Sequence, residues 1–110
     1  MIQSVGDTLQ NALRKCTDRE ERVKFKESVK LQVLQGLQEL HSRGFAYCDL
    51  HVGNVFVIED WVFLDDLEYL TPIDDSPPTK RYSFRLSSGM KAREVDVKQY
   101  EAFVSDLIAL

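Results

Sequence analysis

Three side chains with oxygen donors stand near the middle of this 110-residue chain, and their types and spacing suggest one chemistry. Asp49 and Asn54 lie five residues apart in a polar loop, and Asp66 follows twelve residues after Asn54. A carboxylate can accept the proton of a substrate hydroxyl, and an amide oxygen with a second carboxylate suits magnesium, which prefers hard oxygen ligands. These are the three oxygen donors that phosphoryl transfer on magnesium-ATP needs.

A short β-hairpin is the element expected to bring these side chains together. Runs of β-forming apolar residues at 55–58 and 62–64 flank a turn. Antiparallel pairing of the two runs would return Asp66, at the end of the second strand, to the neighbourhood of Asn54. Asp65, one residue before Asp66, is the alternative metal ligand. A ribbon this short is marginal alone, so we expect it to lie on a helix.

Helical periodicity predicts most of the remaining framework. A short helix is expected at 4–16, capped by Ser4 or Asp7, and the main helix is expected at 19–43. The apolar stripe of the main helix is formed by Val23, Val29, Val33, Leu34, Leu37 and Leu40. A third amphipathic helix is expected at 91–110. Its predicted buried face contains Val95, Val97, Tyr100, Phe103, Val104, Leu107 and Ile108.

The other segments complete a mainly α fold with a small β-hairpin. Residues 46–66 hold the polar loop and the hairpin, and 67–90 is a long loop rich in Pro, Ser, Gly and Asp. With 44% hydrophobic and 29% charged residues, the chain has the composition of one ordinary globular domain, 1–110.

Composition also argues against several classes of function. The formal net charge is −4 and the acidic and basic residues are well mixed, so we expect no basic patch that would bind nucleic acid. No apolar run approaches the ~20 residues of a membrane span, so we expect no membrane partner. Cys16 and Cys48 lack CxxC spacing and are expected to be reduced thiols in a cytoplasmic, intracellular protein. Cys48 has no histidine placed to activate it, so we expect it to be buried and structural.

A resemblance supports the chemistry suggested above. The run D-L-H-V-G-N that starts at Asp49 resembles the catalytic loop of the protein-kinase-like superfamily. It is closest to the D-L-H-x-G-N form of aminoglycoside and choline phosphotransferases and other atypical kinases, whereas the protein-kinase form has Lys where His51 stands. The run D-L-E that starts at Asp66 resembles the small-molecule-kinase variant of the D-F-G triplet. The resemblance implies Asp49 as catalytic base, Asn54 and Asp66 as magnesium ligands, and Asp96 as a brace of the catalytic loop.

The resemblance covers nearly the whole chain, as a kinase-like C-terminal lobe with the N-terminal lobe absent. Segment 67–90 then corresponds to an activation segment. ATP lies between two lobes in this superfamily, so the chain would carry about half of a nucleotide site. The five glycines never cluster into a glycine-rich loop, and no strand lysine is present to hold the phosphates. Tyr47 and Cys48 stand where His-Arg or His-Gly is usual, which alters the bracing of the loop.

Simpler roles remain open for several of these residues. Asp and Asn favour turns, so Asp49 and Asn54 could merely cap a loop. His51 is a candidate cofactor-binding residue, although we expect it to be a polar loop residue that faces the nucleotide site or water. Lys80 and Arg81 could receive a phosphate, but a solvated pair is favoured.

Two classes of function follow. The first is an ATP- and magnesium-dependent phosphotransferase acting on a protein Ser/Thr hydroxyl or on a small-molecule alcohol. The second is a truncated pseudokinase that serves as a protein-interaction module, with a partner in place of the missing lobe. The chain could also be a piece of a longer protein.

Overall fold

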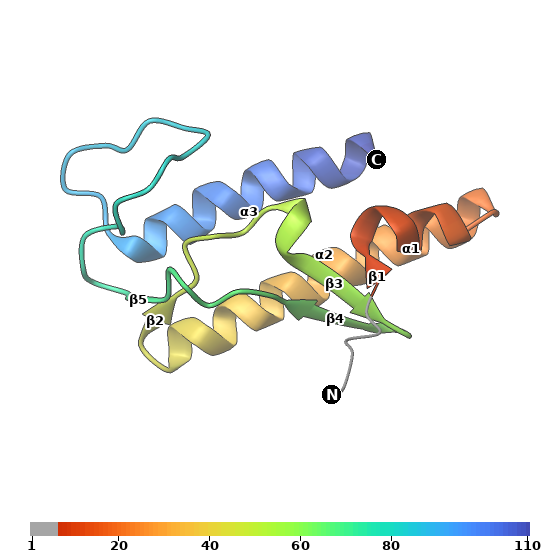
Figure 1. The fold of residues 1–110 in the computed structure, drawn as a ribbon, viewed down its shortest axis with the longest axis horizontal. Helices are drawn as coiled ribbons and strands as arrows, with labels where there is room; N and C mark the ends of the chain where they lie inside the picture. Colours follow the sequence, from red (N-terminus) through yellow and green to blue (C-terminus); the bar gives the residue numbers. More distant parts are fainter. Residues whose placement is uncertain (1–6) are drawn as a thin grey trace.

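The computed structural model describes residues 7–110. Most of the regular structure in this range is helical, and the rest is short antiparallel strands (Figure 1). The elements in chain order are β1 (Asp7–Thr8), α1 (Leu9–Lys15), α2 (Arg19–Ser42), β2 (Phe45–Ala46), the 3₁₀ turn η1 (Val52–Asn54), β3 (Val55–Ile58), β4 (Trp61–Leu64), β5 (Thr71–Pro72) and α3 (Ala92–Ala109). The predicted mainly α class is thus confirmed, although the hairpin belongs to a larger sheet. In this described part of the chain, no helix is both long enough and apolar enough to cross a membrane.

The long helix α2 matches the predicted 19–43 segment closely. Asp18 caps its start by accepting a hydrogen bond from the backbone N–H of Glu20 (3.2 Å). Gly44 follows its end with φ +91°, a conformation that side chains disfavour. One predicted core residue is wrong, because Val23 is 56% exposed. It lies about a third of a turn from Val29 around the helix, on the margin of the stripe formed by Val29, Val33 and Leu37.

The predicted hairpin is confirmed, and it lies on α2 as expected. β3 and β4 pair antiparallel, with Val55 opposite Leu64 at one end. The Gln32 side chain of α2 clamps the ribbon: its Oε1 accepts from the N–H of Val62 (3.0 Å), and its Nε2 donates to the carbonyl of Asp60 (2.9 Å). The hairpin is therefore fixed relative to the helix by hydrogen bonds as well as by packing.

The N-terminal helix is shorter than the predicted 4–16. Thr8, not Asp7, is its N-cap, and Ser4 lies outside the described residues. Asp7 instead forms β1 and pairs with Val57, which makes β3 the central strand of a three-stranded sheet. The pairing satisfies backbone groups along the edge of β3 that would otherwise be unpaired. A two-residue strand has no detectable sequence period, so the pattern could not reveal it.

The C-terminal helix α3 runs beside α2 in the opposite direction (Figure 1). Its buried face consists of Ala92, Val95, Asp96, Gln99, Phe103 and Leu107. Val97 and Ile108 were expected on that face but are 57% and 68% exposed. Val97 follows Val95 by two residues, so it points to the opposite side of the helix. The polar residues Asp96 and Gln99 occupy buried positions instead. Both accept hydrogen bonds from the backbone next to Asp49.

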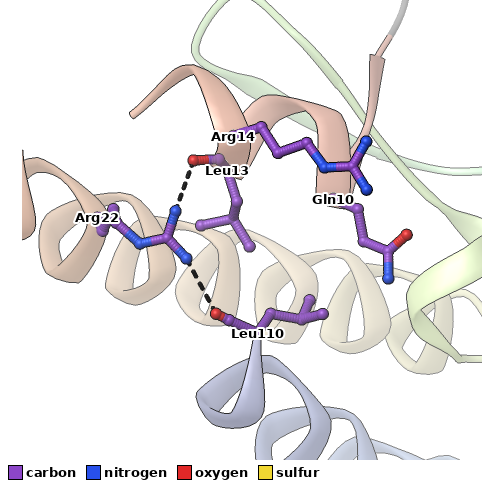
Figure 2. A pocket seen from close by; sticks show the side chains of 5 residues that line it. All are labelled: Gln10, Leu13, Arg14, Arg22 and Leu110. Carbon is purple, nitrogen blue, oxygen red and sulfur yellow. Dashed lines mark hydrogen bonds between the residues drawn. The ribbon is translucent and has the colours of Figure 1, made fainter. Parts of the chain in front are cut away.

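Arg22 of α2 fastens the ends of the two neighbouring helices (Figure 2). Its guanidinium donates to the carbonyl of Leu13 in α1 (2.8 Å) and to the carbonyl of Leu110 after α3 (2.9 Å). Arg14 and Gln10 line the pocket beside this contact. A cation at these carbonyls satisfies acceptors that a helix end leaves open, and it suits the negative end of the helix dipole.

The loop 67–90 folds over the start of α3. Within it, β5 pairs with β2, and the remainder is irregular as predicted. Ile73, Tyr82 and Phe84 pack on a small core of Ala46, Cys48, Met90, Ala92 and Val95. This second core packs the loop against Cys48, the residue before Asp49.

Candidate functional site

A buried carboxylate from α3 holds the backbone just before Asp49. Asp96 is 1% exposed, and its two oxygens accept from the N–H groups of Tyr47 (2.9 Å) and Cys48 (2.7 Å). His41 Nε2, at the end of α2, lies 2.6 Å from the same carboxylate. A carboxylate can only accept, so His41 carries the proton at Nε2. This is the contact that the bracing role expected for Asp96 requires.

Gln99 holds the backbone on the other side of Asp49. Its Oε1 accepts from the N–H of Leu50 (3.0 Å), and its Nε2 donates to the carbonyl of Cys48 (3.3 Å). Sequence reasoning missed this residue. The signal that could have found it is a polar side chain three positions after Asp96, in register with the buried apolar residues of α3. The two α3 side chains together fix the path of the loop.

Asp49 and Asn54, the central predicted pair, are in direct contact. The Asn54 Nδ2 donates to the Asp49 carboxylate at Oδ2 (2.8 Å) and to the Asp49 carbonyl (2.9 Å). Both bonds use the amide nitrogen, so the amide oxygen of Asn54 is the atom left to bind a cation. The two side chains are thus held together within the loop.

The end of β4 lies next to the loop that contains Asp49 and Asn54. The N–H of Asp65 donates to the carbonyl of Asn54 (2.8 Å), and the hydroxyl of the buried Tyr47 donates to the carbonyl of Asp65. Burial raises the pKa of Tyr47 well above its usual range, and the charges of Asp49, Asp65 and Asp66 raise it further. The negative charges of three carboxylates therefore act on this one hydroxyl.

Asp66 and His51 each make a local contact with their own turn. Asp66 is exposed, has φ +61°, and accepts at Oδ1 from the N–H of Glu68 (3.1 Å). His51 is exposed, and its Nδ1 accepts from the N–H of Gly53 (3.1 Å). A Cβ atom on Gly53 would lie 3.0 Å from the His51 ring, so a larger residue there would push the exposed imidazole out of its present position. His51 contributes to the shape of the loop rather than contacting Asp49.

Lys80 is the main difference from the expected site. It was expected to be solvated, but its side chain is only 12% exposed, and its ammonium group binds the Asp49 carboxylate at Oδ1. The same group donates to the carbonyl of Cys48 (3.1 Å) and lies 4.2 Å from the centre of the Tyr69 ring. Loop composition alone could not show which residue of 67–90 would reach Asp49, because the loop has no period.

A hollow of about 260 Å³ opens beside the Asp49–Lys80 pair. Its polar lining consists mainly of Asp49, His51, Lys80, Arg81, Gln99 and Asp106. A small hydroxyl-bearing group in this hollow would have access to the carboxylate.

Few of the described side chains near Asp49 could hold a metal ion on their own. The described residues contain no group of three or more His, Cys, Asp or Glu side chains placed to hold a metal ion. Magnesium in a phosphate complex needs only one or two protein ligands, because phosphate oxygens and water supply the rest. The amide oxygen of Asn54 and the carboxylate of Asp66 are oxygen donors of the kind that such a complex uses.

Cys48 is a buried free thiol, as expected, and its reactivity can be predicted. Burial raises its pKa to about 12, with a further contribution from the charge of Asp96, so almost no thiolate forms at pH 8. Cys16 is half-buried. We expect iodoacetamide at pH 8 to alkylate Cys16 more than about tenfold faster than Cys48 in the native protein. Peptide mass spectrometry would measure both rates, and urea should make them similar. Equal rates in the native protein would contradict the burial of Cys48.

Two comparisons with known proteins were made for this chain, and neither gives a match. A scan against models of protein families finds no match for this chain, and a search of curated proteins finds none either. The functional interpretation therefore rests on the residues and distances described above.

Proposed function

We propose that this chain is the C-terminal lobe of a kinase-like phosphotransferase that uses magnesium-ATP. The observation that carries the proposal is the contact between the Asp49 carboxylate and the Asn54 amide, in a loop held by the buried Asp96. A turn that only reverses the chain needs no buried carboxylate and no bracing from a distant helix. These contacts hold one carboxylate in a fixed position, as a base requires.

In the proposed reaction, Asp49 accepts the proton of an acceptor hydroxyl. The oxygen of that hydroxyl forms a bond to the γ-phosphorus of ATP. The bond from this phosphorus to the bridging oxygen breaks, and ADP leaves with the electron pair. The acceptor is a protein Ser/Thr hydroxyl or a small-molecule alcohol that enters the hollow beside Asp49.

Asn54 and Asp66 would hold the magnesium ion. The metal supplies charge that offsets the phosphate oxygens when the nucleotide is bound. Asn54 then has two functions, because its amide nitrogen positions Asp49 while its amide oxygen binds the cation. His51 shapes the turn between Asp49 and Asn54.

The remainder of the nucleotide site must come from elsewhere. The glycines at 6, 36, 44, 53 and 89 are too scattered for a phosphate-binding loop. A segment of a longer chain or a protein partner in place of the missing lobe would supply that loop and a lysine. Affinity of this lobe alone for nucleotide should therefore be weak.

Thermal unfolding with nucleotide tests the proposal. At a magnesium-ATP concentration ten times the Kd, stabilisation would be about 1.4 kcal/mol, or a Tm increase of about 5–10 °C. Asp66→Asn should abolish the increase, and it should preserve the fold because Asn tolerates φ +61° and can still accept from Glu68. Asp75→Asn, at an exposed loop position, is the matched control and should respond like the wild type. No response in the wild type would contradict the proposal.

The interaction-module alternative has one specific observation in its favour. The outer face of the hairpin is apolar: Phe56 lies opposite Phe63, and Ile58 lies opposite Trp61. Trp61 is 66% exposed and Phe63 is 49% exposed. Exposed apolar surfaces often mark binding sites. A melting temperature that does not change with magnesium-ATP would favour this alternative.

A further inference from the structure

Lys80 is a cation that the local motif does not account for. It belongs to the irregular loop 67–90, 31 residues after Asp49, yet its ammonium group contacts the carboxylate of Asp49 and the carbonyl of Cys48. The aromatic rings of Tyr69 and Tyr82 flank this group at 4.2 and 5.6 Å from their centres. Such surroundings hold the charge in one place and shield it from water.

The catalytic loop itself supplies no permanent positive charge at this point. His51 stands where the protein-kinase form has Lys, but its Nδ1 faces the N–H of Gly53 and its side chain is exposed. Phosphoryl transfer depends on positive charge beside the transferring group, because its oxygens carry the charge of the transition state. Among the described residues, Lys80 is the one whose ammonium group binds Asp49.

We propose that Lys80 contacts the transferred phosphoryl group and so supplies, from the loop 67–90, the cation that the catalytic loop lacks. This inference rests on the proposed function. An acceptor oxygen must lie within about 3 Å of the Asp49 carboxylate for proton transfer, and within about 3–3.5 Å of the phosphorus that it attacks. A phosphoryl group so placed is within reach of an ammonium group already bound to that carboxylate.

The bonding of Lys80 leaves capacity for this contact. An ammonium group has three N–H donors, and protein oxygens of the described residues accept from it at Asp49 and Cys48. A third donor is therefore left for a phosphate oxygen. The hollow lined by Asp49 and Lys80 gives an oxygen from outside access to both groups. In this low-dielectric setting, a bond to an anionic oxygen is stronger than at an exposed lysine.

The test compares ATP with ADP, because only ATP carries the group that Lys80 would contact. Calorimetry on the whole chain with magnesium would give the affinity ratio for the wild type and for Lys80→Met, which keeps the aliphatic stem. We expect the wild type to prefer ATP, and the variant to lose at least about tenfold in affinity for ATP with ADP affinity unchanged. Lys80→Arg should restore part of the preference. Lys98→Met, at an exposed position of α3, should behave like the wild type.

Three results would overturn the inference, and they are distinguishable from one another. If Lys80→Met lowers the affinities for ATP and for ADP equally, Lys80 only holds the loop 67–90 against Asp49. If Lys80→Met leaves both affinities unchanged, the ammonium group does not contact a phosphate. If the wild type binds neither nucleotide, the proposed function fails and Lys80 has no phosphoryl group to contact. Urea unfolding of each variant would separate a change in ligand contact from a change in stability.

Discussion

Asp96→Ala is expected to lower the free energy of unfolding by about 3–5 kcal/mol, because it removes one partner of a buried charged network. The N–H groups of Tyr47 and Cys48 would lose their acceptor, and His41 would lose its partner. All three donors are in or next to the buried interface between α2, α3 and the loop that contains Asp49, where water cannot easily replace the carboxylate. Urea denaturation followed by circular dichroism would measure the change.

Asp106→Ala is the matched control for this prediction. Asp106 lies on the same helix but is exposed, so the variant has the same change in helix propensity without the buried network. Its effect should stay within about 0.5 kcal/mol. Equal effects of the two substitutions would show that Asp96 does not hold the loop.

Phe103→Ala is expected to destabilise the protein by about 3–5 kcal/mol, through lost burial and the cavity left behind. Phe103 is 1% exposed and belongs to the core cluster shared by α1, α2, the sheet and α3. It also lines the hollow beside Asp49, so the cavity would adjoin the candidate site. The midpoint of urea unfolding should fall with little change in the slope of the transition.

Phe63→Ala removes the same side chain from the exposed face of β4 and is the control for this prediction. Phe63 is 49% exposed, so we expect a loss below about 1 kcal/mol. A large loss from Phe63→Ala in the isolated chain would mean that the outer face of the hairpin is covered in solution. That result would agree with the interaction-module alternative.

Local signals account for the elements that were predicted correctly. The cap Asp18 and the stop at Gly44 fixed the ends of α2, because capping and positive φ depend on neighbouring residues only. The hairpin was predictable for the same reason, since its two strands are adjacent in sequence. The failures at Val23, Val97 and Ile108 have a different cause. An apolar residue at a helix margin is buried only if another element covers it, and periodicity does not say which elements do.

The sequence by itself determined the chemistry available at the candidate site. The side chains of Asp49, Asn54 and Asp66 have the oxygen donors for a base and a magnesium complex, and the spacing between Asp49 and Asn54 lets one short loop join them. That the two residues share one loop followed from the chain alone, whereas their hydrogen bond was found in the structure.

Only the tertiary structure decided what surrounds that pair. Lys80 and Gln99 reach the loop across 31 and 51 residues of sequence. Asp96, expected there only from the family resemblance, reaches it across 49. Contacts of this kind depend on how α3 and the loop 67–90 pack against the rest, and no local period encodes that packing. The motif thus fixed which groups are present, while long-range packing fixed the charge and the hydrogen bonds around them.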